Sequence, residues 1–373
     1  MSSALHALDD LEQLIFELVA IESVNPDLIP LGSGETKVSR FVALWLAAAG
    51  LEVEVVEPVA GRPSVVGTLR GSGGGRSLML NAHMDTVGAG GMVDAFSPVV
   101  RDGRVYGRGA YDMKASLAAI MITAREANKL RLKGDLIITA VADEEVASIG
   151  TSAVLEKFRA DFGIVTEPTE LRLCLAHKGF VWLEVETKGV AAHGSRADLG
   201  VDAIAHMGRI LTGVLELDRR LRSGSRHGLL GTGSIHASLI EGGQEMSTYP
   251  ARCVAKLERR TVPGENGASS LREILELIGD ERATGRVLLE RPPSEVDADH
   301  PLTHAVAQAA GGDPLLIGVA YWMDMALLNA AGIPTVAYGP EGEGEHADVE
   351  WVDVASVEKC VQVYLRAAKL LCG

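Results

Sequence analysis

The sequence predicts an α/β protein with a mostly parallel sheet flanked by helices, into which a ferredoxin-like α+β domain is inserted. Two observations lead to this fold class. Strand-like and helix-like segments alternate in the N-terminal half of the chain, as in the β-α-β units that build parallel sheets. From about Lys178 the order changes to β-α-β-β-α-β, which is typical of a split ferredoxin-like unit. We therefore expect residues 1–177 and 293–373 to form one domain and residues 178–292 to form the insert.

The N-terminal part of the first domain follows from apolar spacing. Apolar residues three and four apart predict helices, whereas short alternating or continuous apolar runs predict strands. The expected helices are 8–20, 36–50 and 115–129, and the expected strands are 51–57, 77–83, 135–142 and 160–166. Each of these strands is followed by polar residues or a turn, so their ends are candidate sites for functional side chains.

The insert and the C-terminal part follow from the same patterns. The insert is expected to contain strands 180–188, 233–240, 251–260 and 286–290, with helices 201–222 and 268–280. After Pro292 and Pro293, the expected elements are helices 300–310, 321–331 and 352–371 and a strand 335–338. That last strand would rejoin the first sheet, which makes the middle segment an insertion rather than a following domain.

Composition limits the classes of function. The chain has 373 residues, of which 47% are hydrophobic and 23% charged, enough to bury a full core. With 50 acidic against 35 basic residues its net charge is -15, which disfavours nucleic acid and anionic membrane surfaces as partners. The cysteines lack C-x-x-C spacing, so neither a disulfide framework nor a zinc-thiolate site is predicted.

The N-terminal segment argues for a cytoplasmic protein. Asp9, Asp10 and Glu12 stand where a secretion signal would carry positive charge. No apolar run approaches the roughly 20 residues of a membrane span. We expect a cytoplasmic location and no membrane contact.

Acidic and histidine side chains recur just after the predicted strands of the first domain. His83 and Asp85 close the strand 77–83 in NAHMDT, Glu144 and Glu145 follow 135–142, and Glu167 follows 160–166. Ligands of open α/β sheets bind at the carboxyl ends of the strands, where all of these side chains would meet. The pattern therefore predicts one site formed by several segments.

Two further residues belong to the same pattern. Asp112 lies in GRGAYDMKAS before the helix that starts near Lys114, and His346 lies in the loop EGEGEHADVEW after the strand 335–338. Each signal alone has a simpler explanation: a helix-capping Asp112, a flexible surface loop at His346, a solvated acidic turn at Glu144 and Glu145. Their joint occurrence at one sheet edge favours a functional site.

The combined donor set is that of a metal site. Two histidines with three or four carboxylates suit Zn²⁺ or a similar divalent ion. They also offer enough oxygens to bridge two metals about 3.5–4 Å apart. Of two adjacent carboxylates, one can bind a cation while the other accepts a proton from water. The residues therefore predict a dinuclear hydrolase.

These motifs together carry a family resemblance. The segments NAHMDT, GRGAYDMKAS, ADEE, TEPT and EHADVEWV, in this order, resemble the metal-site motifs of the acetylornithine deacetylase, succinyl-diaminopimelate desuccinylase and carboxypeptidase G family. Members of that family are dinuclear zinc aminoacylases and peptidases. The similarity runs from the VAIESVNP segment to the last helix, so it covers essentially the whole chain.

The resemblance implies a role for each residue of the site. The implied metal ligands are His83 and Glu167 for one ion, Glu145 and His346 for the other, and Asp112 between them, with a cis peptide to Met113. Asp85 would support His83, and Glu144 would be the general base that deprotonates a bridging water. The implied cofactors are two divalent ions, zinc first, with cobalt or manganese as alternatives.

The insert carries two more residues by resemblance. His193 in GVAAHGSRADLGVDAI resembles the residue that stabilises the tetrahedral oxyanion, often from a partner subunit. Arg260 in ERRTVPGE resembles the arginine that pairs with the substrate carboxylate, with Arg259 as the adjacent alternative. Strand alternation allows only one of the two to face the site. The insert is thus expected to act as a lid or dimerisation domain, and the protein as a homodimer.

Two segments depart from the family pattern. Many relatives have an N-x-x-P segment where this chain has Ser247-Thr248-Tyr249-Pro250, and Thr-Asp-Ala where it has Met323-Asp324-Met325. Both would line the substrate side. They leave the metal chemistry intact but leave the amino acid and the acyl group unassigned.

The expected activity is metal-dependent hydrolysis of the amide bond of N-acyl amino acids by attack of a metal-bridging water. The alternative is a metallocarboxypeptidase or dipeptidase acting on short peptides with a free C-terminal carboxylate. Two other classes stay open. A catalytically silent relative would have lost Glu144 or some ligands, and this chain retains them all. A two-metal phosphoesterase would use the same ions on a different bond.

Overall fold

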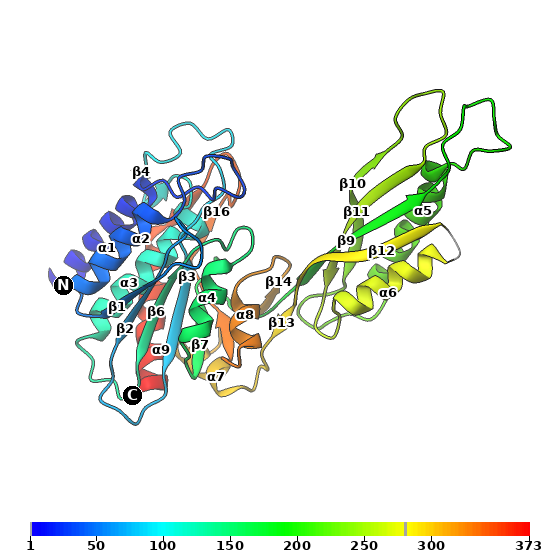
Figure 1. Cartoon of the computed structure of the whole chain (residues 1–373). Helices are drawn as coiled ribbons and strands as arrows, with labels where there is room; N and C mark the ends of the chain where they lie inside the picture. The colour runs from blue at the N-terminus through cyan, green and yellow to red at the C-terminus, as the bar shows by residue number, and fades with distance from the viewer. Residues whose placement is uncertain (1, 280–281) are drawn as a thin grey trace. The chain divides into compact units, whose positions relative to one another are not determined.

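The computed structural model describes residues 2–279 and 282–373, with side chains from Asp10 onward. The chain forms two compact units. The first unit contains the residues up to Leu175 together with Val296–Ile317 and Met323–Gly373. The second unit contains Ala176–Glu295 and Gly318–Trp322. Each unit has its own sheet and its own core (Figure 1).

The first unit is built on a sheet with a parallel centre. Its strands, in spatial order, are β1 (Glu52–Val56), β2 (Ser64–Leu69), β6 (Leu136–Val141), β3 (Leu78–His83), β7 (Phe162–Val165), β15 (Thr335–Ala337) and β8 (Leu173–His177). β3 pairs in parallel with both β6 and β7, and β7 pairs in parallel with β15. β1 and β2 add an antiparallel edge. The predicted fold class is confirmed.

Helices cover both faces of this sheet, so its central strands are buried along their whole length. One face packs against α2 (Thr36–Ala48), α3 (Ala115–Ala127) and α9 (Val354–Cys372), with α1 (Ser2–Ala20) against α3 and α9 and α7 (Pro301–Ala309) against α9. The other face packs against α4 (Ile149–Lys157) and α8 (Met325–Ala330), over a core that includes Val66, Met79 and Ile137. Figure 1 shows these two layers on either side of the sheet.

A second, small sheet in the first unit joins distant parts of the chain. Its order is β16 (Gly342–Glu343), β17 (Trp351–Asp353), β5 (Arg104–Tyr106) and β4 (Val99–Arg101). Trp351 lies opposite Tyr106 in an antiparallel ladder. This sheet was not predicted from the sequence, because strands of two or three residues show no readable alternation. It brings the segment around His346 to the segment around Asp112.

The second unit has the predicted β-α-β-β-α-β order. Its elements are β9 (Gly179–Lys188), α5 (Ala203–Ser223), β10 (Ser234–Gly242), β11 (Arg252–Thr261), α6 (Gly267–Ile278) and β12 (Ala283–Arg291). The antiparallel sheet has the order β10-β11-β9-β12, and the apolar side chains of β9 and β11 pack under α5 and α6. The Asp202 side chain caps α5 by accepting the Ala205 N–H. The predicted end of the second helix at Asp280 lies outside the described residues.

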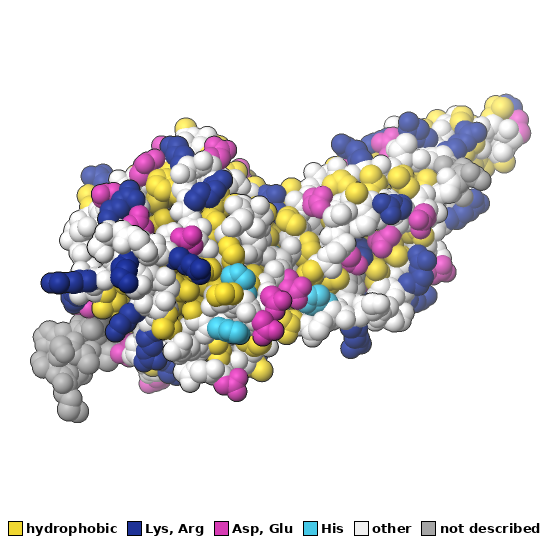
Figure 2. Space-filling model, turned by 90° about the horizontal axis from the view of Figure 1, so that it is seen from below, with side chains coloured by type: hydrophobic (Ala, Val, Ile, Leu, Met, Phe, Trp, Pro, Cys, Tyr) yellow, Lys and Arg dark blue, Asp and Glu magenta, His cyan; other side chains and the backbone are white. Residues whose placement is uncertain are grey.

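Several elements differ from the sequence prediction. β2, β8 and α4 were not predicted, nor were the short strands β13 (Ser294–Glu295) and β14 (Leu316–Val319). The helix expected over 321–331 begins only at Met325. In the part of the chain that the structure describes, no helix is long and apolar enough to cross a membrane. Figure 2 shows basic side chains spread over one face of the molecule with acidic ones among them.

Candidate metal centre

Neighbouring parallel strands deliver most of the predicted ligands. His83 is the last residue of β3, Glu144 and Glu145 follow the end of β6, and Glu167 follows the end of β7. Because β3 lies between β6 and β7 and runs parallel to both, the carboxyl ends of the three strands adjoin. The strand order of the sheet therefore accounts for the meeting of these side chains.

Asp112 and His346 reach the same place by another route. Asp112 lies in the short segment η1 (Ala110–Lys114), between β5 of the small sheet and α3, where the backbone angles of Asp112 and Met113 are not helical. It does not cap α3, because the N-cap residue of that helix is Lys114 and no side chain bonds to its first turn as a cap. His346 lies in the loop between β16 and β17 with a positive φ of 60°. Neither residue follows a strand of the main sheet directly, and the small sheet holds both segments.

Asp112 lies between the two histidines. Its Oδ1 is 3.0 Å from Nε2 of His83, and its Oδ2 is 3.3 Å from Nε2 of His346. His346 Nε2 is also 3.0 Å from Oε2 of Glu145. On the other side, His83 Nε2 lies 3.7 Å from Oε1 of Glu167. The two oxygens of the Asp112 carboxylate thus face two different groups of possible metal ligands.

The donor atoms are close enough to share metal ions. His83, Glu144 and Glu167 have ligand atoms within 4.8 Å of one another, and so do His83, Asp112 and Glu145. Imidazole nitrogens and carboxylate oxygens suit zinc, manganese or cobalt. The residues present therefore fit a pair of divalent ions, although Glu144 also lies within ligand distance of His83.

Carboxylate crowding dominates the electrostatics of the centre. Burial, with the charge of Glu167 added, raises the pKa of Glu144 well above its ordinary value. Burial also raises the pKa of Glu167 strongly, and His83 offsets only part of this rise. Burial and the charge of Asp112 raise the pKa of Glu145. Such a cluster is a place where a bound cation lowers the cost of ionising the acids.

The pKa shifts of the two histidines and Asp112 favour the charged form of each group, whereas those of the glutamates favour the neutral form. Burial disfavours the charged form of His83, yet its hydrogen bond to Asp112 and the charge of Glu167 raise its pKa well above the usual range. Hydrogen bonds to Asp112 and Glu145 raise the pKa of His346 to about 10. Burial works against ionisation of Asp112, but its two histidine partners lower its pKa. In the metal-free protein, protons on the imidazole nitrogens thus occupy the positions where a cation would bind.

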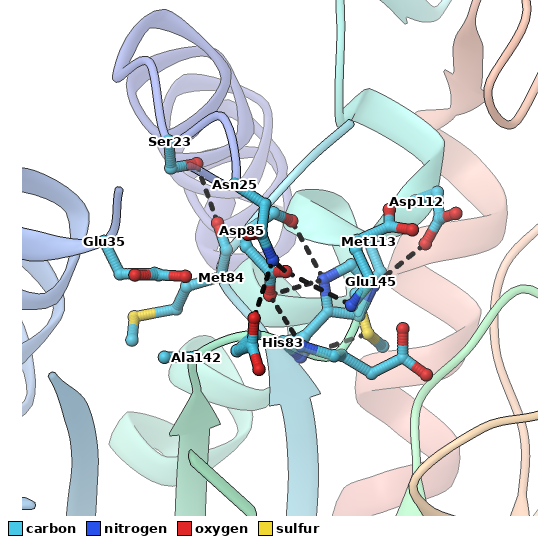
Figure 3. A network of polar contacts seen from close by, with 12 residues as sticks. Ser23, Asn25, Glu35, His83, Met84, Asp85, Asp112, Met113, Ala142 and Glu145 are labelled. Atoms are coloured by element: carbon cyan, nitrogen blue, oxygen red, sulfur yellow. Dashed lines mark hydrogen bonds and ion pairs between the residues drawn. The ribbon is translucent and has the colours of Figure 1, made fainter. Parts of the chain in front are cut away.

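Asp85 orients more than one group (Figure 3). Nδ1 of His83 lies 2.9 Å from the backbone carbonyl of Asp85, which can only accept, so Nδ1 carries a proton and Nε2 points to the cluster. The Asp85 carboxylate is 3.6 Å from the same Nδ1. It accepts the backbone N–H groups of Glu144 and Glu145 at 3.1 and 3.2 Å and the Asn25 amide at 2.8 Å. Asp85 therefore also anchors the turn that carries both glutamates.

A buried polar network behind this turn was not predicted from the sequence. Oδ1 of Asp143 accepts from Asn25 at 3.0 Å and from Arg62 at 2.8 Å. Arg62 also forms a two-point contact with the buried Glu35, at 2.8 and 2.9 Å. Asp143 itself has a φ of 69°. The first acid of the Asp143-Glu144-Glu145 triplet is thus a structural anchor, and only the sequence neighbourhood of Asn25 in VAIESVNP hinted at this network.

The candidates of the second unit are surface residues. His193 is exposed, and its Nδ1 lies 2.8 Å from the Ser195 hydroxyl. Arg259 and Arg260 point to opposite faces of β11: Arg259 is 1% exposed and pairs with acids near α6, whereas the Arg260 side chain is 33% exposed. Arg260 lies over the Phe180 ring and pairs with Glu258. Of the two arginines, Arg260 has the accessible guanidinium.

The two segments that depart from the family pattern lie in different units. Met323 is completely buried, and the carboxyl group of its neighbour Asp324 bonds to the Thr151 hydroxyl at 2.5 Å. Burial raises the pKa of Asp324 to about 6. Tyr249 packs its ring against Gly200 in the second unit. Met323 therefore acts on its surroundings through packing, not as an exposed contact.

Comparison with known proteins identifies the family. The model of the peptidase family M20/M25/M40 matches residues 79–370. An acetylornithine deacetylase from Myxococcus xanthus is 30% identical over 394 residues, which cover 100% of both chains. The chain belongs to the M20/M25/M40 family, a family of hydrolases, and the resemblance drawn from its metal-site motifs is confirmed.

Solved structures show the same fold. A tripeptidase from Staphylococcus aureus superposes with a TM-score of 0.81 at 21% identity, with 98% of each chain covered. A protein from Bacillus subtilis described as a dinuclear metal-binding peptidase of the M20 family gives a TM-score of 0.71 at 18% identity, covering 98% of this chain and 99% of that one. The cis peptide between Asp112 and Met113 implied by the resemblance is also present.

Proposed function

We propose that the protein is a dinuclear metal-dependent amidohydrolase that releases the acyl group of N-acyl amino acids. The observation that carries this proposal is the position of Asp112, whose two carboxylate oxygens face His83 and His346 separately. A bridging ligand between two cations needs this arrangement. The full-length similarity to an acetylornithine deacetylase supports a deacylase over other uses of the same centre.

The proposed ligands divide into two sets that share Asp112. His83 and Glu167 would hold one ion, and Glu145 and His346 the other. Zinc is the first choice for this set of nitrogens and oxygens, with cobalt or manganese as alternatives. When bound, such a pair supplies Lewis acidity for the amide carbonyl and makes water more acidic.

Glu144 is the proposed general base. It lies beside Glu145 on a turn whose backbone is held by Asp85, so its position relative to the ligands is set. Glu145 contacts His346, which assigns it to the ligands and leaves Glu144 to handle the proton. Burial raises the pKa of Glu144, so its protonated form persists closer to neutral pH. Its carboxylate takes the proton from the attacking water and delivers it to the nitrogen of the leaving amine.

The insert, residues 178–292, is proposed to act as a lid and as the dimerisation domain. His193 would donate to the oxyanion that forms when water adds to the amide carbonyl. Arg260 would pair with the free carboxylate of the substrate, since a guanidinium fork matches a carboxylate. The surface position of both side chains in the second unit supports these roles, because each is accessible to a ligand. A homodimer through this unit is part of the same proposal.

A metal-reconstituted assay tests the activity. The protein would be freed of metal, loaded with zinc, cobalt or manganese, and offered N-acetyl amino acids, N-succinyl amino acids, dipeptides and a phosphate ester. We expect hydrolysis of the N-acyl amino acids and a loss of about 10²- to 10⁴-fold in kcat for Glu144→Ala. Metal content of the variant serves as the control for its integrity.

The other outcomes separate the alternatives. Preference for dipeptides would favour the carboxypeptidase or dipeptidase. Hydrolysis of the phosphate ester alone would favour a phosphoesterase, and metal binding without any hydrolysis would indicate a silent relative. Full amide hydrolysis by Glu144→Ala would exclude Glu144 as the base.

A further inference from the structure

Arg108 and Glu350 form a buried ion pair beside the candidate metal centre. Their side chains are 2% and 1% exposed, and Nη1 of Arg108 lies 2.7 Å from Oε2 of Glu350. Removing two charges from water is costly unless their remaining donors and acceptors are also satisfied. Here the remaining groups are bound to backbone atoms, and these atoms belong to the segments that carry the proposed ligands.

Glu350 accepts the backbone of the Asp112 turn. Its Oε1 accepts the N–H groups of Tyr111 and Asp112 at 2.9 and 3.0 Å. Its Oε2 accepts the N–H of Gly109 at 2.9 Å, in addition to Arg108. One carboxylate thus holds three N–H groups of a turn that ends at the proposed bridging ligand. Multiple N–H donors on one carboxylate fix both its orientation and that of the turn.

Arg108 reaches two other segments through its guanidinium. Nε donates to the carbonyl oxygen of Gly88 at 3.0 Å, in the loop that follows His83. Nη2 donates to the carbonyl oxygen of Ala347 at 2.8 Å, one residue beyond His346. A planar guanidinium directs these bonds in fixed directions. The ion pair therefore connects the segments of three proposed ligands.

The backbone pairing of the small sheet does not extend to Asp112 or to His346. Its β5–β17 ladder pairs Tyr106 with Trp351, and one further bond joins the Gly107 N–H to the Glu350 carbonyl at 3.2 Å. Among the described residues, no backbone–backbone hydrogen bond joins the stretch from Arg108 to Asp112 with the His346 loop. The His346 side chain is 54% exposed, so packing around it contributes little to its placement. The bond from Arg108 to the Ala347 carbonyl restrains the loop at this point, together with the bond from the Gly91 N–H to the Asp348 carboxylate at 2.9 Å.

We propose that the Arg108–Glu350 pair positions the metal centre by fixing the Asp112 turn against the His346 loop. The inference rests on the proposed function, because it takes Asp112 and His346 as ligands. The pair touches no substrate and no reacting atom, so both are positioning residues. Their effect is on the spacing between the bridging carboxylate and the histidines, and hence on metal affinity.

Glu350→Gln is the principal test. The amide keeps the shape of the side chain but replaces one acceptor oxygen with an NH₂ group, which would face N–H donors that it cannot satisfy. Replacing such outer partners of ligands typically costs about 10- to 100-fold in metal affinity or activity. We expect a loss of that size in zinc affinity of the variant, a parallel fall in kcat, and a change in KM of less than about twofold.

Arg108→Lys provides a second variant. It keeps the positive charge next to Glu350, but an ammonium group lacks the fork that serves Gly88, Ala347 and Glu350 together. We expect a smaller loss of zinc affinity than for Glu350→Gln. If Glu350→Gln fails to fold, Arg108→Lys decides by the same criterion.

Calorimetric titration of the metal-free proteins with zinc, together with their thermal unfolding, gives the readout. Asp161→Asn is the matched control, since it makes the same acid-to-amide change at a carboxylate that accepts the Ser77 N–H at 2.7 Å, next to the opposite end of β3. Glu145→Gln is the control for loss of a ligand. Support for the proposal is a loss of zinc affinity in both pair variants but not in Asp161→Asn.

Two results would overturn the inference, and they are distinguishable. Wild-type zinc affinity in Glu350→Gln, with only a lower unfolding temperature, would show that the pair stabilises the fold without positioning the centre. Wild-type zinc affinity in Glu145→Gln would instead reject the proposed ligand set, and the positioning role with it.

Discussion

The two units hold their predicted functional residues in opposite ways. In the first unit His83, Asp85 and Glu167 are buried, and the buried Asn25 bonds to Asp85. In the second unit His193 is exposed and contacts Ser195, whereas Arg260 is 33% exposed and contacts Glu258 and the Phe180 ring. Burial and multiple hydrogen bonds fix a geometry before any ligand arrives. The first unit thus holds the proposed metal ligands in a fixed arrangement, whereas the second presents groups whose geometry a ligand can still adjust.

This contrast has an electrostatic cause. Acids gathered away from water resist ionisation, and the raised pKa values of Glu144, Glu145 and Glu167 express that resistance. The first unit therefore contains buried carboxyl groups whose ionisation is unfavourable, and a bound cation would make it more favourable. Part-exposed groups such as Arg260 differ from these acids, because water solvates their charge. Changes at the proposed ligands of the first unit should act on metal binding and stability, and changes at His193 and Arg260 of the second unit on catalysis or substrate binding.

The largest effect is expected from metal removal. Stripping the ions with a chelator should abolish hydrolysis, and re-addition should restore it. Since the ions would bind only the folded first unit, metal at about 1,000 times its Kd should stabilise the protein by about 4 kcal/mol. Hydrolysis and thermal unfolding before and after chelation measure both effects. Undiminished turnover in excess chelator would contradict the proposal that the first unit needs metal for hydrolysis.

His193→Ala should give the next largest effect, confined to catalysis. Loss of a donor to the oxyanion lowers kcat by about 10²- to 10³-fold. Metal affinity and unfolding temperature should stay near those of the wild type, because His193 lies at the surface. Steady-state kinetics and zinc titration provide the readout. His236→Ala, at an exposed histidine of the same unit, is the control and should change neither.

Arg260→Ala should act on substrate binding. A charge-assisted bond to the substrate carboxylate contributes about 1.5–3 kcal/mol, so KM should rise by about one to two orders of magnitude. Stability should change little, because the side chain is part exposed. Arg252→Ala, at a 60% exposed arginine of the same strand, is the matched control. A large loss of stability with an unchanged KM would show that Arg260 is structural.

The smallest expected effect is the pH dependence of metal binding. Buried Glu144, Glu145 and Glu167 have pKa values above the ordinary 4.5, and His346 has a pKa of about 10, so the metal-free centre holds protons that the metal must displace. Affinity should therefore increase with pH, about tenfold per unit for each proton released. Calorimetry in buffers with different ionisation enthalpies counts these protons.

The same pKa shifts determine whether the stability of the metal-free protein rises or falls with pH. The folded metal-free protein binds more protons at the three glutamates than the unfolded chain, so their contribution to stability declines as pH rises above the ordinary value of 4.5. Bound metal should flatten this decline. An affinity for zinc that does not vary with pH would show that the acids are already ionised without metal.

Local pattern was sufficient for the main strands and their ends. The apolar runs of β3, β6 and β7 and the polar residues after them were enough to predict that His83, Glu145 and Glu167 lie at one edge of the sheet. The same reasoning failed for β5 and β17, which are too short to show a period. It also gave no role to Asp143, whose carboxylate bonds to Arg62 and Asn25 and anchors the turn before Glu144.

The sequence by itself determined the fold class, the family and the set of residues that could bind metal, because these depend on residue types and on spacing along the chain. Only the tertiary structure decided which partners hold those residues in place. Arg108 and Glu350 stand 242 positions apart, and no local pattern links them. Their contact arises from the pairing of β5 with β17. Physical proximity between distant segments is a property of the folded chain, and the geometry of this centre depends on it.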